Sequence, residues 1–109
     1  MDDTEVLFVD DDPDMTSLMK RVLEKEGYTV NTANGYEEAL EQHNGEDIVV
    51  ADYLFSREAT GIDLINELEP EESFIYSGYD RDFIEREQSI PNETVYVQKP
   101  YMDRLQRLI

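Results

Sequence analysis

The segment Val6-Leu7-Phe8-Val9-Asp10-Asp11-Asp12-Pro13 decides the fold of this chain. Its first four residues are all apolar, as in a strand that is buried on both faces. Asp12 and Pro13 are typical of the N-cap and the first residue of a helix. Apolar residues then recur on one helical face until Gly27 ends the helix: Met15, Leu18, Met19, Val22 and Leu23. The segment therefore predicts a strand that leads directly into a helix.

The same alternation continues to the end of the chain. Further strands are predicted at residues 28–32, 48–51, 74–76 and 95–97, and helices near 36–44, 62–68, 80–88 and from 102 onward. Five strands alternating with helical patterns imply βαβ units, hence a doubly wound parallel sheet with helices on both faces. We expect one α/β domain over residues 1–109, whose last helix is short or truncated.

The charge balance is strongly acidic. The 109 residues include 27 Asp and Glu against 9 Lys and Arg, for a formal net charge of −18. Such a surface repels nucleic-acid phosphates, so we expect no direct DNA or RNA binding by this chain. Self-repulsion destabilises the compact state at low ionic strength and is screened in molar salt, where the Debye length falls to about 3 Å. The composition therefore favours a halophilic protein.

The sequence indicates neither a membrane protein nor a secreted one. No apolar run approaches the roughly 18 residues of a transmembrane helix, and residues 1–5 are acidic, without the basic region of a signal peptide. The count of 0 Cys excludes disulfides, thiolate metal sites and thiol catalysis. We expect a cytoplasmic protein.

Polar residues follow four of the five predicted strands. Asp10 and Asp11 follow the first, Asp52 the third, Ser77 the fourth and Lys99 the fifth. The carboxyl ends of parallel strands share one edge of the sheet, where ligands bind in open α/β folds. Crowded carboxylates repel one another unless a cation is present, and carboxylates with water suit Mg²⁺. With a metal and a lysine to neutralise phosphoryl oxygens, this edge is suited to forming an aspartyl phosphate.

Four motifs resemble the signatures of response-regulator receiver domains from two-component systems. They are "VLFVDDDP" at residues 6–13, "DIVVAD" ending at Asp52, "FIYSGY" around Ser77 and "VYVQKPY" around Lys99. The resemblance spans essentially the whole chain, with the motifs in the family's order. It implies a flavodoxin-like, CheY-like sheet with strand order 2-1-3-4-5.

The resemblance also implies a role for each site residue. Asp52 would accept the phosphoryl group, and Lys99 and Ser77 would contact it. One Mg²⁺ would be held by oxygen ligands from four residues: Asp10, Asp11, Asp52 and the backbone carbonyl of Leu54. The Lys99–Pro100 peptide bond would be cis and aim the lysine inward.

The implied function is a switch in a phosphorelay. A sensor histidine kinase or phosphotransfer protein would donate the phosphoryl group, since His43 is expected on the surface and the chain holds no other histidine. Recruitment of Ser77 would let Tyr96 turn inward and change the face formed by the fourth helix, fifth strand and fifth helix. A downstream effector or fused output domain would read that face. The chain would catalyse only its own phosphorylation and dephosphorylation and is not otherwise an enzyme.

The loop after Asp52 departs from the family pattern. Receivers usually have proline four residues after the acceptor and glycine eight after it. Here Ser56 replaces the proline, and Gly61 lies one residue further along than the family's glycine. The departure bears on the lifetime of the phosphate.

Two other functions remain open at this point. A haloacid-dehalogenase-like phosphatase also uses an Asp-x-Asp after its first strand, but it would make Asp10 the nucleophile and leave Asp52 without a role. A receiver-shaped interaction module that never carries phosphate has the altered loop as its only support. An EF-hand is excluded, because Met15 stands where glycine is required and Arg21 where the bidentate glutamate is required.

Overall fold

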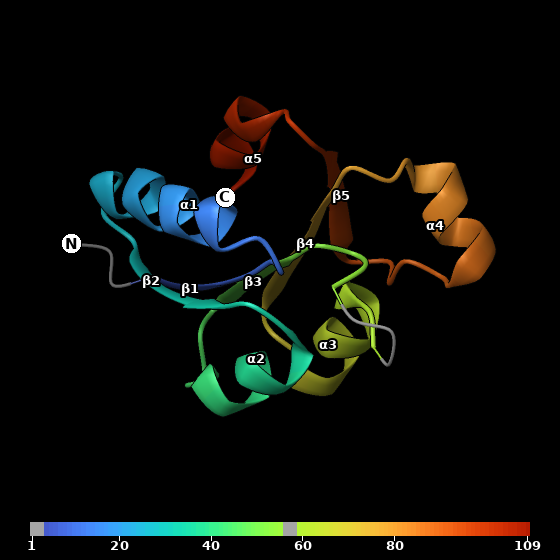
Figure 1. Cartoon of the computed structure of the whole chain (residues 1–109), viewed down its shortest axis with the longest axis horizontal. Helices are drawn as coiled ribbons and strands as arrows, with labels where there is room; N and C mark the ends of the chain where they lie inside the picture. The colour runs from blue at the N-terminus through green and yellow to red at the C-terminus, as the bar shows by residue number, and fades with distance from the viewer. Residues whose placement is uncertain (1–3, 56–58) are drawn as a thin grey trace.

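Five strands and five helices alternate along the described chain. A computed structural model describes residues 4–55 and 59–109, and Figure 1 shows their arrangement. The strands are β1 (Glu5–Val9), β2 (Thr29–Ala33), β3 (Ile48–Ala51), β4 (Glu72–Ser77) and β5 (Thr94–Gln98). The helices are α1 (Pro13–Lys25), α2 (Tyr36–Gln42), α3 (Gly61–Leu68), α4 (Arg81–Glu87) and α5 (Met102–Leu108). Every predicted element is present, with ends that differ by at most two residues.

The strands form one parallel sheet in the order β2-β1-β3-β4-β5. The predicted order is thereby confirmed, with β1 and β3 adjacent at the centre. Val9 is paired with Ala51, the last residue of β3. The residues that follow these two strands therefore emerge side by side at the carboxyl edge.

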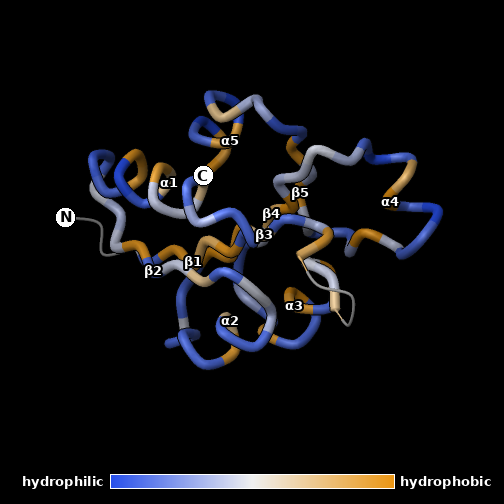
Figure 2. Tube along the Cα trace, in the orientation of Figure 1, coloured by the Kyte–Doolittle hydropathy of each residue, from blue (hydrophilic) through white to orange (hydrophobic). Residues whose placement is uncertain are grey.

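Helices cover both faces of the sheet (Figure 1). On one face Val6 and Phe8 of β1 pack with residues of α1 and α5, among them Met19, Leu23 and Leu105. On the other face Leu7 and Val9 pack with residues of α2, α3 and α4, among them Ala39, Ile62 and Ile84. Because residues 6–9 of β1 are buried on both sides of the sheet, all four are apolar, and the hydropathy colouring of Figure 2 shows the apolar character of the central strands.

Local capping explains where the helices next to the carboxyl edge begin. Asp12 is the N-cap of α1, and its side chain accepts a hydrogen bond from the backbone N–H of Asp14 at 3.0 Å, which confirms the predicted cap. Thr60 and Asp63 form a capping box at the start of α3. Gly27, with φ of 100°, ends α1 as predicted.

Within residues 4–55 and 59–109, none of the helices combines the length and apolar character needed to cross a bilayer.

Candidate functional site

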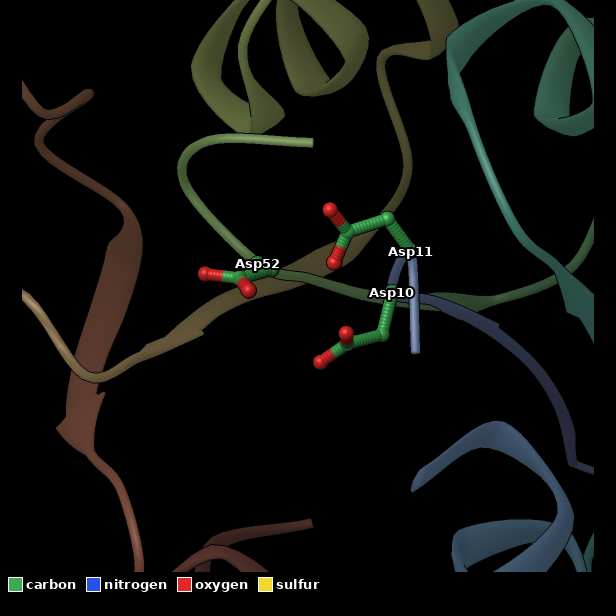
Figure 3. Close-up of side chains that lie close together, drawn as sticks. All are labelled: Asp10, Asp11 and Asp52. Atoms are coloured by element: carbon green, nitrogen blue, oxygen red, sulfur yellow. The ribbon is translucent and has the colours of Figure 1, made fainter. Parts of the chain in front are cut away.

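Three carboxylates meet at the carboxyl edge of the sheet. Asp10 and Asp11 follow β1, and Asp52 follows β3. Each offers an oxygen within 4.8 Å of the others. Figure 3 shows the three side chains reaching into the same space from two neighbouring strands.

Asp10 is the buried and fully bonded member of the group, with an exposed fraction of 1%. Its Oδ1 accepts a hydrogen bond from the backbone N–H of Asp12 at 3.0 Å, and its Oδ2 lies 2.6 Å from the Nζ of Lys99. The side chain of Asn34 also donates to the backbone carbonyl of Asp10 at 3.0 Å. The side chain of Asp10 is 2% exposed and that of Asp52 is 12% exposed, so Asp10 is the less accessible of the two to an incoming substrate, which argues against the phosphatase alternative.

Lys99 joins the carboxylates from β5. Its Nζ is 2.6 Å from Asp10 Oδ2 and 3.0 Å from Asp52 Oδ2. The peptide bond to Pro100 is cis, and the backbone N–H of Lys99 donates to the carbonyl of Ser77 at 2.8 Å. Burial opposes the charge on the ammonium, but the hydrogen bond to Asp10 and the charges of both acids outweigh it and raise the pKa of Lys99. The lysine is therefore a permanent cation at physiological pH.

Asp11 is the exposed member of the group. Desolvation and the neighbouring charges of Asp10 and Asp52 raise the pKa of its carboxyl above the ordinary value. One ammonium does not offset three carboxylates. Hard oxygen donors in this number suit a divalent cation such as Mg²⁺, so the residues present fit the metal that the sequence predicted.

The backbone around Asp52 is held tightly. Its N–H donates to the carbonyl of Val9 at 3.0 Å, and its Oδ1 accepts from the N–H of Tyr53 at 2.7 Å. Gly61 lies directly against it, since a Cβ at that position would be 2.1 Å from the carbonyl oxygen of Asp52. The sequence showed only that Gly61 was displaced by one residue, whereas the structure explains why glycine is required there. Ser56 lies outside the described residues.

The hydroxyls of Ser77 and Tyr96 both bind the backbone of the β4–α4 loop. Ser77 is fully buried at the end of β4, and its hydroxyl accepts from the N–H of Tyr79 at 3.2 Å. The hydroxyl of Tyr96 donates to the backbone carbonyl of Tyr79. Both predicted switch residues thus bind the same residue of that loop. Leu54 lies two residues after Asp52 and forms an isolated antiparallel bridge with Thr60.

Sequence reasoning missed a second polar cluster, located before β3. Glu46 has an exposed fraction of 3% and accepts from Asn31 Nδ2 at 2.6 Å and from the N–H of Asn44 at 2.9 Å. His43 was expected on the surface but is half-buried, with its Nε2 3.7 Å from Glu46 Oε1. The motifs carried no signal for this cluster, because it depends on a side chain of β2, that of Asn31, reaching a residue that precedes β3.

Comparison with known proteins agrees with this architecture. The family described as "Response regulator receiver domain" matches residues 6–106. The transcriptional regulatory protein CpxR of Klebsiella pneumoniae is 38% identical over 64 residues, which are 58% of this chain but only 27% of CpxR. The chain thus spans about a quarter of that relative.

Two solved structures illustrate the similarity of fold. The receiver domain of Francisella response regulator 1452 is 27% identical with a TM-score of 0.75, covering 94% of this chain and 90% of that one. Response regulator TrrA of Thermotoga maritima, solved in complex with Mg²⁺ and BeF, is 24% identical with a TM-score of 0.70, covering 97% and 99%. The family match over nearly the whole chain, the strand order and the acidic group at the carboxyl edge agree with one another, and neither alternative function is favoured. This chain belongs to the response regulator receiver domain family.

Proposed function

We propose that this chain accepts a phosphoryl group on Asp52 in a reaction that depends on one Mg²⁺ ion. The observation that carries the proposal is the convergence of Asp10, Asp11 and Asp52 within 4.8 Å, with Lys99 bonded to two of them. The receiver fold supplies the context, and the similar protein TrrA has been solved in complex with Mg²⁺ and BeF.

The metal ligands in this proposal are the three carboxylates and the backbone carbonyl of Leu54. Bound Mg²⁺ would neutralise negative charge on the transferring phosphoryl group and on the acids around it. Asp10 is well suited to this role because it is already fixed through Asp12 and Asn34. Asp11 is suited to it because a nearby cation favours the ionised form that its neighbours oppose.

Asp52 is the nucleophile. An oxygen of its carboxylate attacks the phosphorus of a phosphohistidine on a partner, the new P–O bond forms as the P–N bond breaks, and the imidazole leaves. The hydrogen bond from Tyr53 to Oδ1 fixes the rotation of this carboxylate before the attack. The ammonium of Lys99 would then donate to one of the negatively charged phosphoryl oxygens, and the Ser77 hydroxyl would donate to another.

The proposed switch begins at Ser77. When its hydroxyl turns toward the phosphoryl group, it gives up the bond from the N–H of Tyr79. The β4–α4 loop and the Tyr96 hydroxyl, which binds the carbonyl of Tyr79, would then rearrange together. The face formed by α4, β5 and α5 would change shape and be read by an effector or a fused output domain.

The remaining assignments follow from this role. We infer that the donor is a sensor histidine kinase or a phosphotransfer protein, and that residues 1–109 act as one receiver domain in the cytoplasm. Catalysis is limited to the domain's own phosphorylation and dephosphorylation.

Intact mass spectrometry after incubation with acetyl phosphate and Mg²⁺ tests the proposal. The wild type should gain the mass of one phosphoryl group, and the gain should disappear in EDTA and in the Asp52→Asn variant. The matched control is Asp47→Asn, which removes an acid from the opposite end of β3 and should leave phosphorylation intact. Phosphorylation of Asp52→Asn, or none of the wild type, would refute the assignment.

A further inference from the structure

The side chain of Gln88 connects two helices near the site. Gln88 is the C-cap of α4, and its amide reaches the N-terminal end of α3. The hydroxyl of Thr60 donates to Gln88 Oε1 at 2.6 Å, and Gln88 Nε2 donates to Asp63 Oδ1 at 2.6 Å. All three side chains are partly buried, so the amide uses its acceptor and its donor in a site with limited access to water.

The two partners of Gln88 are themselves bonded to each other. Thr60 Oγ1 accepts from the N–H of Asp63 at 3.2 Å, and Asp63 Oδ2 accepts from the N–H of Thr60 at 2.9 Å. The backbone hydrogen bond from Thr60 outweighs desolvation and, with Gln88, holds the pKa of Asp63 below its usual value. An ionised carboxylate only accepts hydrogen bonds, which fixes the orientation of the Gln88 amide.

This capping box is joined to the backbone of the phosphoacceptor. The N–H of Gly61 donates to the carbonyl of Tyr53 at 2.7 Å, and Leu54 forms its bridge with Thr60. Gly61 also lies in contact with the carbonyl of Asp52. Any displacement of the start of α3 is therefore transmitted to residues 52–54, which we call the acceptor segment.

We propose that Gln88 is a positioning residue for the phosphorylation site. Its amide holds the start of α3 from the end of α4, and through Thr60 and Gly61 it keeps the acceptor segment in place to receive Mg²⁺. The effect on metal binding rests on the proposed function, whereas the effect on the acceptor segment does not. Because coupling between two sites is reciprocal, ligands at Asp52 would also stabilise the end of α4 by this route, separately from Ser77 and Tyr96.

A swap of functional groups tests this positioning role. Gln88→Glu places a second carboxylate against Asp63 and removes the donor between them. The double variant Asp63→Asn with Gln88→Glu restores every bond, because the new amide at position 63 would donate to the new carboxylate at position 88. That carboxylate would still accept from the hydroxyl of Thr60. The double variant also has the net charge of the wild type.

Gln106→Glu is the matched control for added charge. Gln106 Nε2 donates to Glu26 Oε1 at 2.8 Å and so connects α5 with α1, away from the acceptor segment. The substitution creates the same clash between carboxylates at a different helix pair. Should Gln88→Glu not fold, Gln88→Met removes the same hydrogen bonds without adding charge, and the same results are expected of it.

Two measurements are compared across these proteins. Amide hydrogen exchange of Gly61 in the metal-free protein reports on the acceptor segment, and a tyrosine-fluorescence titration gives the Kd for Mg²⁺. Gln88→Glu should accelerate Gly61 exchange and raise the Kd by about 3- to 10-fold, a smaller effect than the loss of a residue that contacts a metal ligand directly. The double variant should return both values to within about 2-fold of the wild type, and Gln106→Glu should leave both unchanged.

Any other outcome would overturn either the positioning role of Gln88 or the proposed function. Unchanged Gly61 exchange, unchanged Mg²⁺ affinity or a failed rescue would overturn the positioning role while leaving the proposed function intact. A wild type that binds no Mg²⁺ would refute the proposed function. Gly61 exchange would in that case still decide whether Gln88 holds the acceptor segment.

Discussion

Replacing Gly61 by alanine should damage both stability and phosphorylation. The new Cβ would lie 2.1 Å from the carbonyl oxygen of Asp52 and 3.1 Å from Cδ1 of Ile75, where ordinary contact begins at 3.4 Å. The side chain of Ile75 can shift to relieve its contact, but the carbonyl of Asp52 is part of the backbone and cannot move alone. Either the backbone at Asp52 or the start of α3 must therefore move by more than an ångström. Overpacking of this kind costs about 3 kcal/mol, which lowers the Tm of a domain of this size by roughly 12–20 °C.

The same displacement would move Asp52, the proposed nucleophile. A misplacement on the order of 1 Å lowers the rate of a positioned reaction about 100-fold. Urea unfolding and time-resolved intact mass with acetyl phosphate measure the two effects. Gly35→Ala is the control, because nothing lies within 4 Å of its new Cβ and its φ of 178° suits any residue. A Gly61→Ala variant as stable and as readily phosphorylated as Gly35→Ala would refute the close approach of Gly61 to the carbonyl of Asp52.

Three further predictions concern charge. Lys99→Met should lose about 3 kcal/mol of stability in EDTA, because it leaves buried Asp10 without its cation, and Mg²⁺ should recover part of the loss in urea unfolding. Folding lowers the pKa of Asp63, so its stabilising contribution is complete above the unfolded value near 4 and is lost as the pH falls through the folded value. The free energy of unfolding of Asp63→Asn should therefore fall less steeply than that of the wild type below about pH 4. An equally steep fall in both proteins would contradict this. Raising potassium chloride from about 0.1 to 2 M should raise the Tm by at least roughly 5 °C, since it screens the net charge of −18, and a flat Tm would argue against self-repulsion.

The sequence was sufficient to predict the burial and position of residues whose environment depends only on the strand that contains or precedes them. Val6 to Val9 are apolar because β1 is central and covered on both faces, so the run itself indicated a buried strand. Four site residues end or follow strands of the parallel sheet, and parallel pairing alone brings them to one edge: Asp10, Asp52, Ser77 and Lys99. The strand order came from the family resemblance, since spacing does not determine which strands are neighbours.

The sequence was insufficient to predict the burial and partners of residues whose environment is formed by a different part of the chain. Val95 has the apolar character of a buried strand residue but is 39% exposed, because β5 is an edge strand. Gln88 seemed only to end a weak helix, since its two partners are more than twenty residues earlier in the chain. Glu46 is buried by donors from Asn31 and Asn44, which no local pattern indicates.

The position of Lys99 has a consequence for the order of events. With its ammonium bonded to Asp10 and Asp52, the lysine acts as a resident counter-ion that keeps the acidic pocket assembled before any metal arrives. In the proposed function, Asp10 and Asp52 would share these oxygens with Mg²⁺, which would weaken their hold on the ammonium. The lysine would then become available to a phosphoryl group only after the metal site is filled.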